Sequence, residues 1–210
     1  MFQFARLLTL QGDQRETSAW AGEVTAYVNA NTDLEVSLWG AAFGHPVGTV
    51  AWSSMVEGRA QLFGEQQKLL TDGAYLDLVA KAQDWVSAPA EDIFRSFVHG
   101  NPPEEPPAVG AVAAVTQAVA ATGKMPEAMA WATGMADHAS SVIGSPVGLF
   151  VNAYGDFGGL AFITLQADMA AVDASTDAVR DDSGYMERIA ASAGLFVDGS
   201  AHQSLLTKLA

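Results

Sequence analysis

The chain has 210 residues, of which 50% are hydrophobic, and a formal net charge of −14. With 24 acidic against 10 basic side chains, it lacks the cationic footprint that nucleic acids and anionic membranes attract, so we expect no nucleic-acid partner. The absence of cysteine excludes disulfides, thiolate metal ligands and a thiol nucleophile. Residues 1–10 lack the apolar block of a signal peptide, and the weakly polar stretch 108–122 is too short to cross a bilayer. We therefore expect a cytoplasmic protein without membrane insertion.

Hydrophobic periodicity predicts the elements of the first half. Polarity alternates from Phe2 to Leu10, which is typical of a strand, whereas Trp20, Val24 and Val28 follow the spacing of an amphipathic helix. The glycines and proline of residues 44–48 favour a hairpin loop between two strands. The expected order is strand 2–10, helix 20–28, strands 36–43 and 49–55, a helix over 62–86 interrupted at Asp72-Gly73, and strand 93–98.

The second half of the sequence repeats the first. Gly12, Glu16 and Trp20 recur in step as Gly123, Glu127 and Trp131. A repeat unit of roughly 100 residues is too long for a solenoid, so it indicates two like domains. The expected elements are a strand over 109–121, a helix with Pro126 in its first turn, strands 147–154 and 159–166, a helical region over 169–197, and a strand over 202–209.

Each half therefore reads βαββαβ, the order of a ferredoxin-like unit, in the α+β class. Half of the eight prolines lie in residues 100–108, which predicts an extended linker between domains 1–99 and 109–210. A ferredoxin-like sheet carries helices on one face only. Two copies can cover their open faces by packing sheet against sheet.

The order of elements, together with Gly158–Leu165, Asp168 and Asp182–Tyr185, resembles the dimeric α+β barrel superfamily, in particular its NIPSNAP-like and antibiotic-biosynthesis-monooxygenase-like members. The resemblance implies two tandem units that form an intramolecular barrel. The superfamily includes cofactor-free quinone-type monooxygenases, haem-handling enzymes, lactone isomerases and proteins without known chemistry. The fold does not choose among these.

Polar residues within the predicted strands are the first site candidates. Asn152 lies in an otherwise aromatic row, and a buried amide needs a hydrogen-bond partner in the protein or in a ligand. Arg6 and Arg95 could hold a carboxylate or polarise a carbonyl if they face a cavity, and are ordinary surface residues if they do not. Gln117 is interpreted as the repeat counterpart of Arg6.

His99 is the best histidine candidate for a general base or an axial haem ligand, although a lone histidine is more often structural. The four histidines form no metal-binding pattern, and no nucleotide-binding or hydrolase motif is present. Aromatic side chains could line a pocket for a flat ligand or fill the core between the sheets. These residues are Trp39, Phe43, Trp52, Phe150, Tyr154 and Phe162.

The sequence thus predicts a protein that binds a hydrophobic, flat aromatic or quinone-like ligand, as a cofactor-independent monooxygenase or isomerase. A non-catalytic carrier and a structural protein with a filled barrel are the alternatives. The sequence requires no cofactor. It leaves open whether the protein binds haem and whether it forms a homo-oligomer. The second half, with Asn152 and Tyr154 where the first has Ala41 and Phe43, is the expected location of the site.

Overall fold

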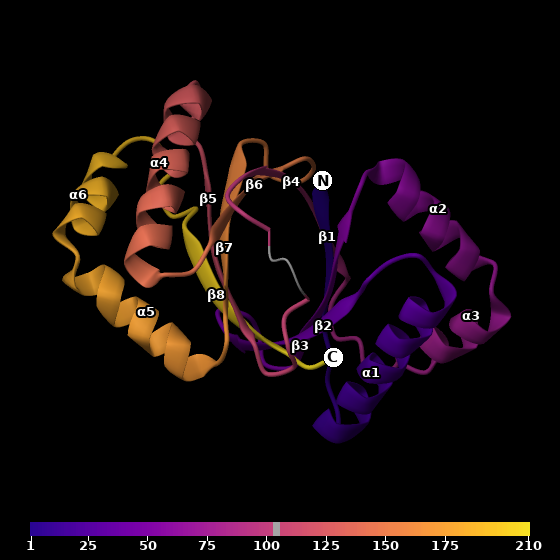
Figure 1. The fold of residues 1–210 in the computed structure, drawn as a ribbon. Coiled ribbons are helices and arrows are strands. Elements are labelled where there is room, and N and C mark those ends of the chain that lie inside the picture. Colours follow the sequence, from indigo (N-terminus) through magenta and orange to yellow (C-terminus); the bar gives the residue numbers. More distant parts are fainter. Residues whose placement is uncertain (103–105) are drawn as a thin grey trace.

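The computed structural model describes residues 1–102 and 106–210, so part of the expected linker lies outside the described residues. Its centre is a closed barrel of strands in the order β1-β3-β2-β8-β5-β7-β6-β4 (Figure 1). The first half comprises β1 (Phe2–Thr9), α1 (Gln14–Asn31), β2 (Ser37–Phe43), β3 (Thr49–Val56), α2 (Arg59–Leu70), α3 (Gly73–Ala80) and β4 (Glu91–His99). The second comprises β5 (Val112–Val119), α4 (Met125–Ile143), β6 (Val147–Asn152), β7 (Gly159–Gln166), α5 (Met169–Asp181), α6 (Ser183–Ala191) and β8 (His202–Lys208).

The barrel closes through the edges of the two expected sheets. Within the halves, β1 lies between β3 and β4, and β5 lies between β7 and β8. Between the halves, β2 pairs with β8 and β4 pairs with β6, both antiparallel. The two ferredoxin-like units are therefore confirmed. Their sheets face each other and also join at both edges into one continuous barrel. Because the barrel is closed, none of the described strands has an unpaired edge.

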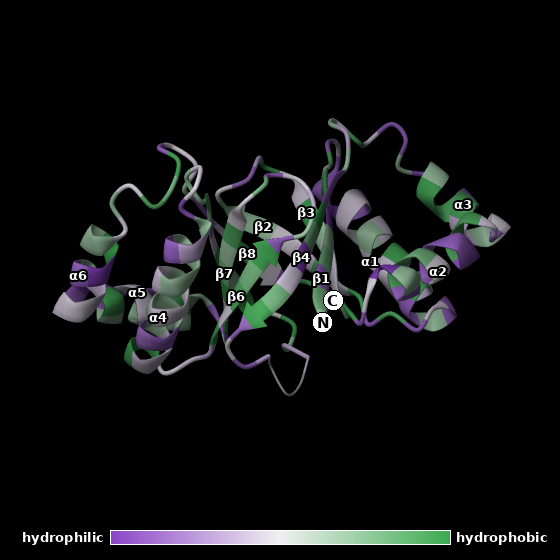
Figure 2. Cartoon of the chain, turned by 90° about the horizontal axis from the view of Figure 1, so that it is seen from above, coloured by the Kyte–Doolittle hydropathy of each residue, from purple (hydrophilic) through white to green (hydrophobic). Residues whose placement is uncertain are grey.

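Side chains alternate between the barrel interior and two outer helical layers. Helices α1–α3 cover the outside of one half and α4–α6 cover the other (Figure 1), and many residues of the barrel strands between them are hydrophobic (Figure 2). Because side chains alternate along each strand with a period of two, the strands contribute to two cores. One core lies inside the barrel and the other lies beneath the helices. The interior core contains Ala5, Leu7, Trp39, Ala51, Ala113 and Leu206. The core beneath α1 contains Trp20, Val24, Val28, Leu38 and Trp52 among others.

Aspartate caps divide the long helical regions. Asp72 accepts hydrogen bonds from the backbone N–H groups of Ala74 and Tyr75, which confirms the predicted interruption of the first region. The helical region predicted over 169–197 is divided in the same way, because Asp182 adopts an extended backbone and caps α6 through Tyr185 N–H. It is shorter than predicted, since α6 ends at Ala191. The first region is likewise shorter than predicted, since α3 ends at Ala80.

The strand register corrects one equivalence between the halves. Arg6 lies opposite Trp52, and Thr116 lies opposite the matching residue Phe162. Thr116, not Gln117, is therefore the counterpart of Arg6. The repeat slips by one residue in the loop after each first strand, and a one-residue slip moves a strand residue to the opposite face.

Candidate functional site

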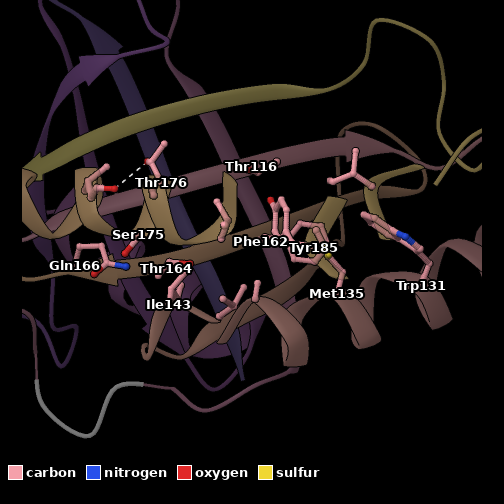
Figure 3. Close-up of a pocket in the computed structure, with 16 residues that line it drawn as sticks. Thr116, Trp131, Met135, Ile143, Phe162, Thr164, Gln166, Ser175, Thr176 and Tyr185 are labelled. Atoms are coloured by element: carbon pink, nitrogen blue, oxygen red, sulfur yellow. Dashed lines mark hydrogen bonds between the residues drawn. The ribbon is translucent and has the colours of Figure 1, made fainter. Parts of the chain in front are cut away.

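A cavity of about 200 Å³ lies in the second half, between the outer face of β5 and β7 and the helices α4, α5 and α6 (Figure 3). Its lining is mainly aliphatic and aromatic, with a few hydroxyl and amide groups. The residues include Ala114, Thr116, Trp131, Met135, Ile143, Phe162, Thr164, Gln166, Val172, Ser175, Thr176, Val179, Tyr185 and Ile189.

The residues that line the cavity are smaller and more polar than the residues at the matching positions of the first half. The strand registers align Phe4 with Ala114, since each lies two residues before Arg6 or Thr116. Phe4 packs on a core cluster that includes Val56. The second half has Gln166 at the position of Val56, because these residues pair with Phe2 and Val112 respectively. One copy of the helix–sheet interface therefore has a packed core where the other has a cavity.

A polar group without a protein partner lies at one end of the cavity. Gln166 is only 7% exposed, and within residues 1–102 and 106–210 no hydrogen bond reaches its side chain. Thr164 and Ser175 lie at the same end (Figure 3). The Gln166 amide offers both a donor and an acceptor, and its atoms are open to the space of the cavity. A ligand with one polar edge would satisfy Gln166.

The other end of the cavity is aromatic. Trp131 stacks edge-on against Phe162 with ring centroids 6.1 Å apart, and its indole N–H donates to the Arg188 carbonyl over 2.8 Å. Burial raises the pKa of the Tyr185 hydroxyl. Tyr185 is therefore a neutral hydrogen-bond donor at neutral pH, available to a ligand oxygen.

The cavity does not fit haem. The described lining contains two residues of a type that can ligate haem iron, Met135 and Tyr185, so the size of the cavity decides the question. Pockets for drug-sized ligands already measure roughly 300 Å³ or more, and haem is larger than most such ligands. A volume of about 200 Å³ accommodates a molecule of one or two rings.

No family model and no curated protein matches the chain. Among solved structures, a candidate monooxygenase from Fusobacterium nucleatum superposes with a TM-score of 0.74 at 9% identity, covering 100% of this chain and 92% of that one. An anthrone oxidase-like protein gives 0.69 at 10% identity, with 100% and 91% covered. The haem-degrading enzyme of Listeria monocytogenes gives 0.50 at 8% identity, with 99% of each chain covered.

The fold is a dimeric α+β barrel. At these identities the likeness establishes the fold alone, with both halves of the barrel in one chain. Among the described residues, no helix is long and apolar enough to span a bilayer.

Two of the expected site residues lie on the outer face of the first half of this dimeric α+β barrel. The Arg6 guanidinium pairs with the Asp92 carboxylate through two bonds of 2.7 Å. Trp52 is buried beneath α1 and donates to the Thr25 hydroxyl over 3.0 Å. Both residues therefore have protein partners away from the cavity.

Four expected residues lie inside the barrel, and two of them are in contact. Arg95 donates to the Asn152 side-chain oxygen over 3.0 Å. Phe150 stacks edge-on against Phe97, and Trp39 donates from its indole to the Ser53 hydroxyl over 2.9 Å. The interior thus brings together Arg95 and Asn152, as well as aromatic residues that fill space.

The remaining expected residues lie apart, with one exception. His99 contacts the Asp137 carboxylate at 2.6 Å, and Tyr154 accepts a hydrogen bond from Arg59 at the surface. Phe43 follows a β-bulge at the end of β2 and is 65% exposed. Only Phe162 lines the cavity.

Sequence reasoning missed most of the lining. Trp131 and Tyr185 each match an aromatic residue of the first half, Trp20 and Tyr75, and such a match favours a packing role over a ligand-binding one. Gln166 was not singled out. The signal that could have found Gln166 was a difference between the two halves. A polar residue in one copy occupies a position that is apolar in the other.

Proposed function

We propose that this protein binds a small, flat hydrophobic ligand, with a phenolic or quinone oxygen at one edge, in the cavity of the second half. The observation that carries the proposal is the Gln166 amide, which has no described hydrogen-bond partner and lies at one end of a mainly apolar cavity. Aromatic walls suit a planar ring, and a few polar groups orient it.

The proposed activity is cofactor-independent oxygenation of an electron-rich phenol. In the conversion of 1-naphthol to 1,4-naphthoquinone, for example, one oxygen atom of O2 enters the ring and the other leaves as water with two substrate hydrogens. The substrate itself supplies the electrons. Gln166 and Tyr185 would stabilise the phenolate oxygen by hydrogen bonds, which favours its reaction with O2.

The alternative is a non-catalytic carrier, and one observation favours it. Among the described residues, no carboxylate, histidine, lysine or arginine lines the cavity, so the lining lacks an ordinary general base. In the enzyme, the phenol proton would have to pass to solvent. In a carrier, no proton transfer is needed.

The test combines calorimetric binding of 1-naphthol and 1,4-naphthoquinone with an oxygen electrode. Ala114→Phe introduces the residue of the first half and should abolish binding by filling the cavity. Phe4→Ala, the reciprocal change in the first half, should leave binding unchanged. Oxygen uptake with formation of quinone in equal amount supports the oxygenase, and binding without uptake supports the carrier. Absence of binding, or equal binding by the Ala114→Phe variant, would overturn the assignment of the cavity.

A further inference from the structure

A buried arginine without a carboxylate partner lies inside the barrel. Arg95 is 5% exposed and belongs to β4. It donates from Nε to Asn152 and from Nη2 to the Gln117 side-chain oxygen, a neutral acceptor in each case. Within the described ranges, no carboxylate oxygen comes within ion-pair distance of Arg95. Its remaining N–H groups have no protein acceptor there.

A buried cation of this kind is expensive, because desolvation is not offset by an opposite charge. Burial lowers the pKa of Arg95 to about 10, so the side chain still carries its charge at neutral pH. The negative charge of Glu91 acts in the opposite direction and raises the pKa of Arg95, but the Glu91 carboxylate forms no bond to the guanidinium. The interior therefore retains a positive charge with unused hydrogen-bond donors.

A second unsatisfied group lies beside the guanidinium. Gln3 is the cross-strand partner of Arg95, and both side chains are on the interior face of their strands. The Gln3 side-chain oxygen is fully buried and has no hydrogen-bond partner. Directly opposite residues in a sheet have Cβ atoms only about 5 Å apart, so the Gln3 and Arg95 side chains extend from adjacent positions on the interior face.

The position of Asn152 is built into the backbone. An added Cβ at Gly159 would collide with the Asn152 amide, so only glycine leaves room for it. The amide in turn holds the Arg95 guanidinium. The orientation of Arg95 is therefore determined by residues of the second half.

We infer that the barrel interior holds a small monovalent oxyanion between Arg95 and Gln3, of which bicarbonate is the simplest that suits both. Its charged oxygens accept from the guanidinium, and its hydroxyl donates to the Gln3 oxygen. Formate has the charge without the hydroxyl and should bind more weakly. This site lies on the opposite face of the sheet from the cavity beneath α4–α6 and is independent of the proposed function.

The test is thermal unfolding of the full chain against bicarbonate and formate at constant pH and ionic strength. A ligand that binds only the folded state raises the Tm, and above its Kd the rise grows with the logarithm of the ligand concentration. We expect such a rise, larger for bicarbonate than for formate at equal concentration, that is lost in Arg95→Gln. The matched control is Arg6→Gln on the outer face, which should keep the full response.

A variant that spares the arginine separates binding from folding defects. Gln3→Leu should retain the formate response and lose the preference for bicarbonate. Crystals of the unaltered protein soaked in bromide should show an anomalous peak beside the guanidinium. A Tm independent of both anions, together with no peak at Arg95, would overturn the inference. The same holds if Arg6→Gln removes the response as fully as Arg95→Gln.

Discussion

Gln166 marks the place where the packed core of the first half is replaced by a cavity in the second. In the first half Val56 is 2% exposed within an apolar cluster. In the second half the amide of Gln166 occupies the matching position and has no described partner. The amide atoms of Gln166 are accessible from the cavity and are not sealed in the core. A polar residue at a position that is apolar in the first half is explained if a ligand in the cavity accepts or donates its hydrogen bonds.

We predict that Gln166→Leu changes the free energy of unfolding by less than about 1 kcal/mol, because the Gln166 amide has no described protein hydrogen bond to lose and the side-chain volume is kept. The same change should weaken binding of 1-naphthol. Chemical denaturation and calorimetry measure the two effects. The reciprocal variant Val56→Gln should lose about 1–3 kcal/mol in the first half without affecting binding. A larger loss of stability in Gln166→Leu would contradict this account.

At the scale of elements, the third helix of each half, α3 or α6, begins at an aspartate cap that a side chain of another helix contacts. Tyr27 donates to Asp72 in the first half, and His138 contacts Asp182 in the second at 2.7 Å. These hydrogen bonds, with those from the helix N-terminus, lower the pKa of each aspartate. Tyr185, on the cavity wall, is held through its backbone N–H by Asp182. The cap therefore links helix α6 to the candidate site.

We predict that Asp182→Asn lowers the Tm at neutral pH and that the difference from the unaltered protein shrinks in acid. The folded-state pKa of Asp182 lies below the unfolded value, so its stabilisation is present above the ordinary aspartate pKa of about 3.9 and is lost as pH falls through the folded pKa. Thermal melts from about pH 6 to pH 2 measure this. Asp198→Asn, in an exposed turn, serves as control. A Tm difference that grows toward acid would count against the cap.

At the scale of the whole molecule, the two halves meet at tight backbone contacts. Gly44 has a φ of +82°, and an added Cβ would collide with the Gln203 carbonyl at the seam between β2 and β8. Gly155, its counterpart in the repeat, has a φ of +84° with open space around it. Close packing therefore restricts the residue in this turn to glycine in the first half, at Gly44, but not at Gly155 in the second.

We predict that Gly44→Ala destabilises the protein more than Gly155→Ala. Both variants bear the left-handed backbone strain of roughly 1–2 kcal/mol, but only Gly44→Ala must also separate β2 from β8. Urea unfolding of the two variants provides the comparison. Equal losses would show that the contact between the halves contributes nothing at this seam.

The charge of the whole molecule leads to a further prediction. With a net charge of −14, the protein should not bind mixed-sequence DNA or RNA, because it has little cationic surface with which to release counterions from phosphates. Fluorescence polarisation at low salt gives binding its best chance. Micromolar affinity that weakens with added salt would disprove the prediction.

The sequence by itself determined the order and type of the elements, the repetition, and the sites of the hairpins and of the cap at Asp72. These follow from local periodicity and turn chemistry, which act over a few residues. It also predicted that Arg95 and Asn152 belong to a site candidate, although not that they meet.

The tertiary structure decided which strand face points into the barrel and which lies beneath the helices. A period of two tells which residues share a face but not what that face meets, so Arg6 and Arg95 were equivalent candidates until the barrel closed. Closure placed Arg6 with Asp92 outside and Arg95 with Asn152 and Gln117 inside. The cavity at Gln166 depended likewise on the packing of α4–α6, because its walls come from elements distant in sequence.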